Sequence, residues 1–219
     1  MIRGVIFDMD GLMFDTERVS MVMWDRELGR QGFRYSPEIG NSIRGRNGEA
    51  IRRILEETYG PGFDFMQALQ GVRADMLQRL EEHGIDVKPG LYPLLDWLEE
   101  QKIPMAVASS SRRDSVERNC RKAGVLDRFR TLVCGDQVTH SKPDPEIFRI
   151  AAAALGVEPA ECLVLEDSFN GVRAGAAGGF ITVMVPDLDA PTPEIDALYT
   201  AKCDSLHEVL ARLKAGDFS

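Results

Sequence analysis

Residues 2–15 read IRGVIFDMDGLMFD, and this stretch decides the expected fold. The apolar, strand-forming residues 5–7 end abruptly in the carboxylates of Asp8 and Asp10, followed by Gly11. Side-chain alternation places both carboxylates on the same side of the strand, and glycine permits a sharp turn. Open α/β sheets bind ligands at the carboxyl ends of their strands, so we expect a central strand that presents two acidic groups to a ligand. Because clustered carboxylates repel each other, they imply a cation, a shared proton or strong hydrogen-bond donors nearby.

Composition restricts the class of protein and of partner. The chain has 219 residues, enough for one large or two small domains, and 44% of them are hydrophobic, enough for a packed core. Its net charge of −9 argues against binding to nucleic acid or to an anionic membrane, both of which favour a basic protein face. The net charge does not argue against a small phosphorylated ligand, which needs only local positive groups. We expect a monomer or a weak dimer.

Three features predict a cytoplasmic protein. Its cysteines form no C-x-x-C motif and are expected to be reduced and structural. The first strand begins at Ile2, so no signal peptide is expected. No apolar run approaches the roughly 18 residues that a transmembrane helix needs. The cysteines are Cys120, Cys134, Cys162 and Cys203.

The spacing of apolar residues divides the chain into two kinds of structure. Residues 16–85 are almost entirely helical in pattern, and we interpret them as a helical cap domain inserted after the first strand. From residue 86 onward, apolar strands alternate with helices, which is the pattern of a doubly wound parallel sheet. The predicted fold is therefore α/β, with a Rossmann-like core of residues 1–15 and 86–219 and an α-helical cap of residues 16–85. Hinges are expected near residues 12–17 and 84–90.

Chemically active side chains follow the ends of several predicted strands. Ser109 and Ser110 follow one strand, Lys142 lies in the loop after another, and Glu166 and Asp167 follow a third. Strand ends in such a sheet converge on one crevice, where the acidic pair of the first strand is also expected. Carboxylates bind Mg²⁺, whereas hydroxyl and ammonium groups bind phosphate oxygens. The set therefore predicts a site for Mg²⁺ and a phosphate group.

The DxDGxxxD pattern of residues 8–15, with the residues that follow the later strands, resembles the four motifs of the haloacid dehalogenase superfamily. The resemblance covers essentially the whole chain and is strongest to β-phosphoglucomutases and related sugar phosphatases with a helical cap. It implies that Asp8 is the nucleophile and forms an aspartyl phosphate. It also implies that Asp10 is the acid–base residue, which protonates the leaving alcohol and then activates water.

The same resemblance implies how the ligands are held. Mg²⁺ is expected on the carboxylate of Asp8, the backbone carbonyl of Asp10 and the carboxylate of Asp167, with Glu166 supporting this metal site. The phosphoryl oxygens are expected to be held by the three groups that follow the other strands, namely Ser109, Ser110 and Lys142, and by the backbone amides of residues 9 and 110. A carboxylate attacks a phosphate dianion only when their repulsion is neutralised, which is the expected role of Mg²⁺ and the lysine.

The cap is expected to close over a small substrate and to select it. Closure excludes water, which strengthens the electrostatics and protects the covalent intermediate. The residues expected to select the substrate are Phe14, Arg44, Arg46 and Asn47.

The expected function is Mg²⁺-dependent hydrolysis of small phosphomonoesters, such as sugar phosphates. A β-phosphoglucomutase-type phosphotransferase is the main alternative. The mutases that the chain resembles have a histidine where this chain has Ser20, and their cap arginine aligns near Gly48, with Arg46 close by. Both departures weaken the mutase interpretation. Dehalogenase activity needs no Mg²⁺ and is disfavoured, because Asp10 and Asp167 are both present.

The candidate site residues are also compatible with purely structural roles. Ser109 is typical of a turn, Lys142 of a surface, and the acidic pair before Ser168 of a helix cap. Asp-x-Asp-Gly occurs in calcium loops, but the later ligands of such a loop do not follow here. A signalling receiver domain has a similar acidic cluster but lacks a helical insertion. A binding module without activity is the last alternative.

Overall fold

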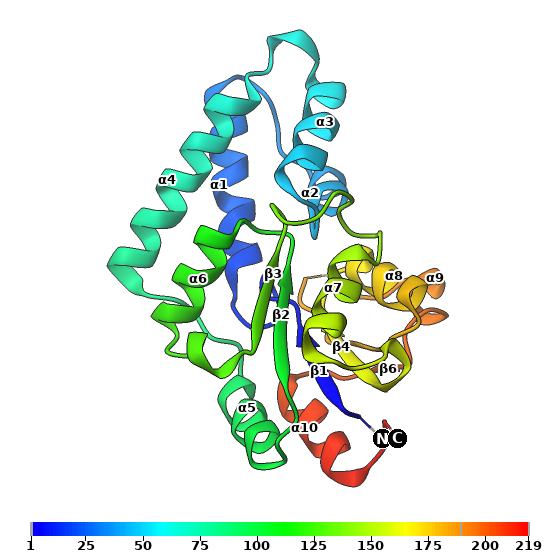
Figure 1. Cartoon of the computed structure of the whole chain (residues 1–219). Coiled ribbons are helices and arrows are strands. Elements are labelled where there is room, and N and C mark those ends of the chain that lie inside the picture. Colours follow the sequence, from blue (N-terminus) through cyan, green and yellow to red (C-terminus); the bar gives the residue numbers. More distant parts are fainter. Residues whose placement is uncertain (1, 189, 219) are drawn as a thin grey trace.

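The computed structural model describes residues 2–188 and 190–218, and within them it shows the expected parallel α/β sheet (Figure 1). Six parallel strands of these residues lie in the order β3-β2-β1-β4-β5-β6. Their bounds are β1 Gly4–Phe7, β2 Met105–Ser109, β3 Thr131–Cys134, β4 Cys162–Glu166, β5 Ile181–Met184 and β6 Ala201–Lys202.

Strand β1 lies at the centre of this sheet. Phe7 pairs with Val107 of β2 on one side and with Leu165 of β4 on the other. Every residue of β1 is buried, because helices cover both faces of the sheet. The strand order changes direction between β1 and β4, and ligands of doubly wound sheets bind in the crevice outside the strand ends at that point.

The helices of the described residues divide into those that cover the sheet and those that form the insertion. On one face of the sheet, α5, α6 and α10 pack around a core that includes Phe7 and Leu94. On the other face, α7 and α8 pack around Ile6 and Phe148. The bounds are α1 Thr16–Arg30, α2 Pro37–Ile43, α3 Gly48–Tyr59, α4 Phe65–His83, α5 Leu91–Glu100, α6 Arg113–Lys122, α7 Glu146–Leu155, α8 Phe169–Gly178, α9 Pro193–Asp196 and α10 Leu206–Ala215. Short 3₁₀ turns lie at Gly60–Gly62, Leu126–Arg128 and Pro159–Glu161.

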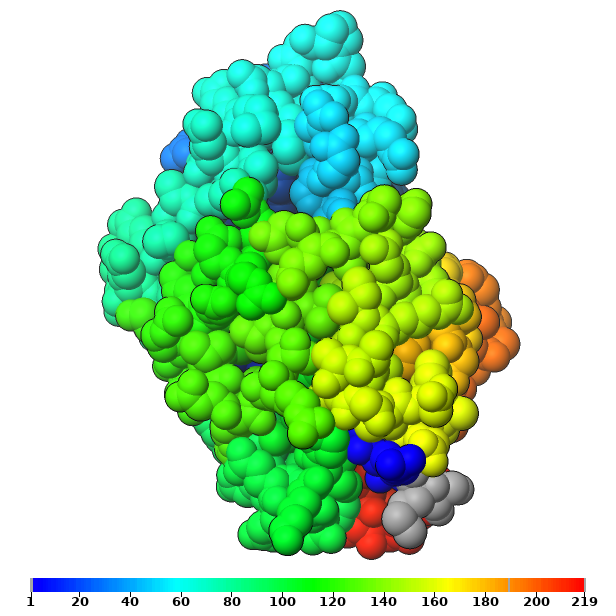
Figure 2. Space-filling model, in the orientation of Figure 1, coloured from blue at the N-terminus to red at the C-terminus, as the bar shows by residue number. Residues whose placement is uncertain are grey.

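Helices α1–α4 form the inserted helical region, which lies beyond the carboxyl ends of the strands (Figures 1 and 2). This region has a hydrophobic cluster of its own, with Trp24, Leu28, Leu55 and Phe65 all buried. Helix α4 packs along α1, while α2 and α3 form the other side of the region. This separate cluster agrees with an inserted helical unit. The exact domain boundaries, with a cap of residues 16–85 and a core of residues 1–15 and 86–219, stay a prediction.

The two segments that join the helical region to the sheet lie side by side. The N–H of Asp15 donates to the carbonyl of Asp86, and the N–H of Lys88 donates to the carbonyl of Met13, both at 2.9 Å. The ammonium of Lys88 is also 2.7 Å from a carboxylate oxygen of Asp187, whose side chain is 3% exposed. These contacts tie both expected hinge segments to each other and to the loop that follows β5.

Local capping explains where helix α3 begins. Its first residue is Gly48, because the side-chain oxygen of the preceding Asn47 accepts a 3.0 Å bond from the N–H of Ala50. Strand β6 was not expected at all, since two residues carry too little periodicity to indicate a strand.

All four cysteines are buried and unpaired, as is typical of structural residues. Burial raises the pKa of the thiols of Cys120 and Cys162 to about 12. Among residues 2–188 and 190–218, no helix has the length and apolar character that crossing a membrane requires.

Two glycines, Gly84 and Gly90, lie in the segment that joins the helical region back to the sheet. They allow a matched test of the packing between α5 and α10. Gly90 has φ +94°, and a Cβ there would lie 2.5 Å from the backbone nitrogen of His207 in α10. Gly84 has φ +76°, but a Cβ there would meet nothing within 4 Å. We expect Gly84→Ala to lower the free energy of unfolding by about 1–2 kcal/mol through backbone strain alone. Gly90→Ala adds a clash between backbones and should cost about 2–4 kcal/mol. Urea unfolding of both variants measures the difference, and equal losses would contradict the close contact between α5 and α10.

Candidate active site

A buried ammonium group links the ends of two neighbouring strands. Nζ of Lys142 lies 2.5 Å from a carboxylate oxygen of Asp8, which follows β1, and 2.6 Å from a carboxylate oxygen of Glu166, which ends β4. It also donates to the carbonyl of Ala108 in β2 at 3.1 Å. The ring of Phe148 lies beneath it, with 4.8 Å between Nζ and the ring centroid. Lys142 is therefore a buried ion-pairing residue rather than a surface lysine.

The carboxylate of Asp10, the second acid of the DxDGxxxD pattern, is held by hydroxyl groups. One carboxylate oxygen of Asp10 accepts a 2.6 Å bond from the hydroxyl of Thr16. The other accepts bonds from the hydroxyls of Ser111, at 2.7 Å, and Ser109, at 3.2 Å. Three hydroxyl donors fix the orientation of Asp10 without neutralising it. This is the setting of a side chain that could exchange a proton with a bound alcohol or water.

Local structure at the end of β4 explains how Glu166 is held. Its second carboxylate oxygen accepts 2.9 Å bonds from both the N–H and the hydroxyl of Ser168. The same hydroxyl of Ser168 accepts the N–H of Gly171 and so caps α8. Both oxygens of Glu166 are therefore occupied, one by Lys142 and one by Ser168.

The carboxylates of Asp8, Glu166 and Asp167 form a buried cluster that is consistent with metal binding. Each offers an oxygen, and these oxygens lie within 4.8 Å of one another. One carboxylate oxygen of Asp167 is buried and has no hydrogen-bond partner among the described residues. Buried polar atoms nearly always have a partner, so this oxygen fits a cation. Because Glu166 is already engaged, Asp8 and Asp167 fit the role of direct ligands, with Glu166 as support.

The charges of this cluster also favour a bound cation. Three ionised carboxylates and one ammonium leave an excess of two negative charges, which a divalent cation would cancel. Burial raises the pKa of the Asp8 carboxyl to about 8, helped by Glu166 and opposed by Lys142. Burial and the same neighbouring acids also raise the pKa of Asp167. For Lys142, burial acts to lower the pKa, but Asp8 and Glu166 outweigh it and raise the pKa.

The helical region contacts this centre through the loop between α2 and α3. The hydroxyl of Ser110 donates to the carbonyl of Gly45 at 2.8 Å. The side-chain amide of Asn170, at the start of α8, donates to the carbonyl of Arg44 at 2.9 Å. The loop is thus bonded to the sheet domain on both sides of the buried cluster.

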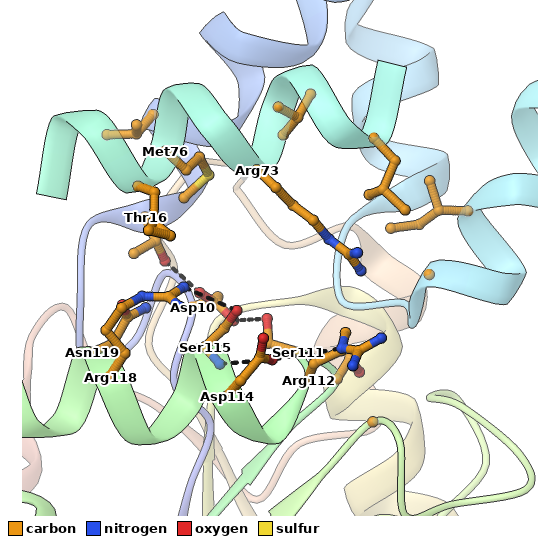
Figure 3. Close-up of a pocket in the computed structure, with 18 of the residues that line it drawn as sticks. Asp10, Thr16, Arg73, Met76, Ser111, Arg112, Asp114, Ser115, Arg118 and Asn119 are labelled. Atoms are coloured by element: carbon orange, nitrogen blue, oxygen red, sulfur yellow. Dashed lines mark hydrogen bonds and ion pairs between the residues drawn. The ribbon is translucent and has the colours of Figure 1, made fainter. Parts of the chain in front are cut away.

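Two cavities that share wall residues lie at the candidate site, and Ser109, Lys142 and Glu166 line neither of them. A small chamber of about 150 Å³ includes Asp8, Asp10 and Asp167 in its wall. A cleft of about 740 Å³ continues from Asp10 and Ser111 between α4 and α6 (Figure 3). The small chamber has room for a phosphoryl group, and the cleft has room for the rest of a substrate.

The residues expected to select the substrate lie in different places. Arg44 borders the small chamber, Arg46 borders both cavities, and Asn47 borders the cleft while also capping α3. Phe14 is fully buried, pairs with Val87 where the chain crosses between the two regions, and lines neither cavity. Its position is that of a packing residue, which does not support a role in selecting the substrate.

Three residues of the site were not predicted from the sequence. Thr16 and Ser111 bond to Asp10, and Glu17 borders the small chamber. Burial, followed by repulsion from Asp10, raises the pKa of Glu17 to about 8, while Arg44 opposes the shift. Glu17 is an acidic residue in the first turn of a helix, a position that the helix dipole commonly favours. Only its position, two residues after the DxDGxxxD pattern, could have indicated that Glu17 lies at the site.

Comparison with known proteins agrees with this geometry. A family model described as haloacid dehalogenase-like hydrolase matches residues 2–179. The chain is 36% identical over 190 residues to the "Probable pseudouridine-5'-phosphatase" of Drosophila melanogaster, covering 83% of this chain and 80% of that protein. It is 30% identical over 188 residues to the fructose-1-phosphate phosphatase YqaB of Escherichia coli (strain K12), covering 83% and 95%.

A solved structure extends the likeness to the whole fold. The crystal structure of a β-phosphoglucomutase from Clostridium difficile superposes with a TM-score of 0.85 and 22% identity, covering 100% of this chain and 97% of that one. That likeness includes the helical region after the first strand. The chain therefore belongs to the haloacid dehalogenase-like hydrolases, in the subfamily of β-phosphoglucomutases and sugar phosphatases that carry an N-terminal helical cap.

Proposed function

We propose that this protein is a Mg²⁺-dependent phosphatase that hydrolyses small phosphomonoesters, such as sugar phosphates, through an aspartyl phosphate on Asp8. The observation that carries the proposal is the buried ion pair between Asp8 and Lys142, with Glu166 beside it and Asp10 nearby. The family assignment supports hydrolysis, and both similar proteins named above are phosphatases by name. The family assignment also excludes the alternative of a signalling receiver domain.

The first half of the reaction breaks the ester bond. A carboxylate oxygen of Asp8 attacks phosphorus, a new P–O bond forms, and the bond from phosphorus to the leaving oxygen breaks. The alcohol that leaves takes a proton from Asp10, whose orientation is fixed by Thr16 and Ser111. Lys142 lies beside the attacking carboxylate and offsets the charge of the phosphoryl group.

The second half releases phosphate. Asp10, now a carboxylate, takes a proton from water, and the resulting oxygen attacks phosphorus and breaks the bond to Asp8. Ser109, Ser110 and the backbone amides after β1 and β2 would hold the phosphoryl oxygens in both halves. Asp8, Asp167 and the backbone carbonyl of Asp10 would hold Mg²⁺, with Glu166 in support, and the ion would supply charge neutralisation for the phosphoryl group.

The relatives differ in their esters, so the substrate must be found by assay. We expect Asp8→Asn to lower kcat/KM at least about a thousandfold against every ester that the native chain hydrolyses, because the nucleophile is lost. The measurement is phosphate release with Mg²⁺ from a panel of sugar phosphates, nucleotides and phosphoglycolate. Asp25→Asn, at an exposed position of α1, is the matched control and should keep full activity.

The same panel separates hydrolase from mutase. β-Glucose 1-phosphate, supplied with a catalytic amount of the bisphosphate, would give glucose 6-phosphate faster than free phosphate if the chain were a mutase. Ser20 stands where the mutases have a histidine, and their cap arginine aligns near Gly48, so we expect phosphate release to dominate. Phosphate release that persists in Asp8→Asn would refute the proposed nucleophile.

Metal binding can be tested without any substrate. We expect Mg²⁺ at about 100 times its Kd to stabilise the native chain by about 2.7 kcal/mol, roughly 5–10 °C in Tm for a chain of this size. Asp167→Asn should lose most of this gain, because it removes a ligand. Without Mg²⁺ the variant should be at least as stable as the native chain, because it also removes a buried repelling charge. Differential scanning calorimetry with EDTA and with Mg²⁺ measures both effects. A variant destabilised in EDTA and still stabilised by Mg²⁺ would contradict the assignment.

A further inference from the structure

The cleft between α4 and α6 has one wall that is mostly apolar and one that is polar. A phosphate ester with its phosphorus at Asp8 must extend its leaving group past Asp10 and Ser111, which border both cavities. The cleft beyond them measures about 740 Å³, within the range of cavities that hold ligands of roughly drug size. The nature of its walls should therefore decide which leaving groups bind.

Helix α4 contributes an apolar stripe to the wall of this cleft. The stripe consists of Leu69, Val72, Met76 and Leu80, of which Val72 and Leu80 are mostly covered. Their spacing of three or four residues places them on one face of the helix. The inner sides of Leu69 and Met76 pack on the cluster around Trp24 and Phe65, while both residues stay partly accessible on the side of the cleft. Figure 3 shows Met76 extending from α4 toward Asp10 and Thr16.

The opposite wall, on α6, is polar. Ser115, Arg118 and Asn119 line it, and Figure 3 shows these side chains near Asp10. The hydroxyl of Ser115 accepts a 3.1 Å bond from the guanidinium of Arg118. A leaving group in the cleft therefore meets hydrogen-bonding groups on one side and hydrocarbon on the other.

A polyol fits these walls poorly. Hydroxyl groups that face the stripe would lose their bonds to water and find no partner, which costs free energy. Hydrocarbon placed there instead gains from leaving water. Of the arginines that α4 contributes to the cleft, Arg79 is already paired with Asp86 at 2.6 Å, which leaves Arg73 as the side chain there that could meet a polar or anionic end.

We propose that the cleft between α4 and α6 binds the leaving group of the substrate, and that it selects phosphomonoesters whose leaving group has an apolar face. This inference rests on the proposed phosphatase function. It names the class of ester within that function: amphipathic phosphate esters are preferred over fully hydroxylated ones of similar size.

A series of n-alkyl phosphates tests the inference, because their leaving alcohols have nearly the same intrinsic reactivity. We expect kcat/KM to rise about two- to fourfold for each added methylene, from ethyl through butyl to hexyl phosphate, as the chain covers the stripe. Hexyl phosphate should also exceed glucose 6-phosphate. A flat or falling series, with the sugar phosphate preferred, would overturn the inference and leave the phosphatase intact.

A matched pair of variants locates the effect. Met76→Gln places an amide in the stripe and should flatten the rise of kcat/KM with chain length. Val22→Gln makes a similar change at a 59% exposed position of α1 that does not line the cleft, and the rise should be unchanged. Equal slopes in both variants would place the alkyl chain elsewhere.

Binding separates this inference from the proposed reaction. Alkylphosphonates cannot be hydrolysed, so their affinity for the native chain can be measured by calorimetry with Mg²⁺. Affinity that rises with chain length, in a protein that releases no phosphate from any ester, would support the cleft and refute the phosphatase. If a terminal carboxylate on the alkyl chain instead raised affinity, and Arg73→Leu removed that gain, the cleft would select a second anion and the apolar preference would be refuted.

Discussion

The structure of the site depends on one buried ammonium group. Removing an ammonium from water costs several kcal/mol, and Lys142 is compensated by two carboxylates, a backbone carbonyl and an aromatic ring. These partners come from β1, β2, β4 and α7, so a single side chain fixes the ends of three neighbouring strands relative to one another. Buried ion pairs are weak evidence for stability, and this one is better explained by chemistry, because it keeps a cation beside the carboxylate proposed to attack phosphorus.

The sheet and the helical region contribute different things to the site. The sheet supplies charge: three buried acids lie against one ammonium, and burial, helped by repulsion between the acids, raises the pKa of Asp8 and Asp167. The helical region supplies shape, through the loop over the small chamber and the wall of the cleft. The division is incomplete, because Thr16 of α1 bonds to Asp10, and α6, which packs on the sheet, forms the polar wall of the cleft.

The sequence predicted the sheet and the residues at its strand ends, because both follow from local patterns. A buried apolar strand rarely ends in two acidic residues unless they bind something, and the helical run after residue 15 was equally clear. The bonds from Thr16 and Ser111 to Asp10 were not predicted, because they depend on how a helix start and a strand-end loop meet in space. Phe14 was expected to help select the substrate, whereas in the fold it is fully buried and packs where the two regions join. Glu17 was overlooked because acids are common in the first turn of a helix, where the dipole stabilises them.

The loop between α2 and α3 meets the sheet domain through main-chain oxygens, those of Arg44 and Gly45. Carbonyl groups are present whatever side chains the loop carries. Its attachment to Ser110 and Asn170 therefore does not depend on the identity of the neighbouring arginines. Substitutions at positions 44 and 46 would leave both of these bonds in place. The attachment of the loop and the side chains that border the chamber can therefore vary independently of each other.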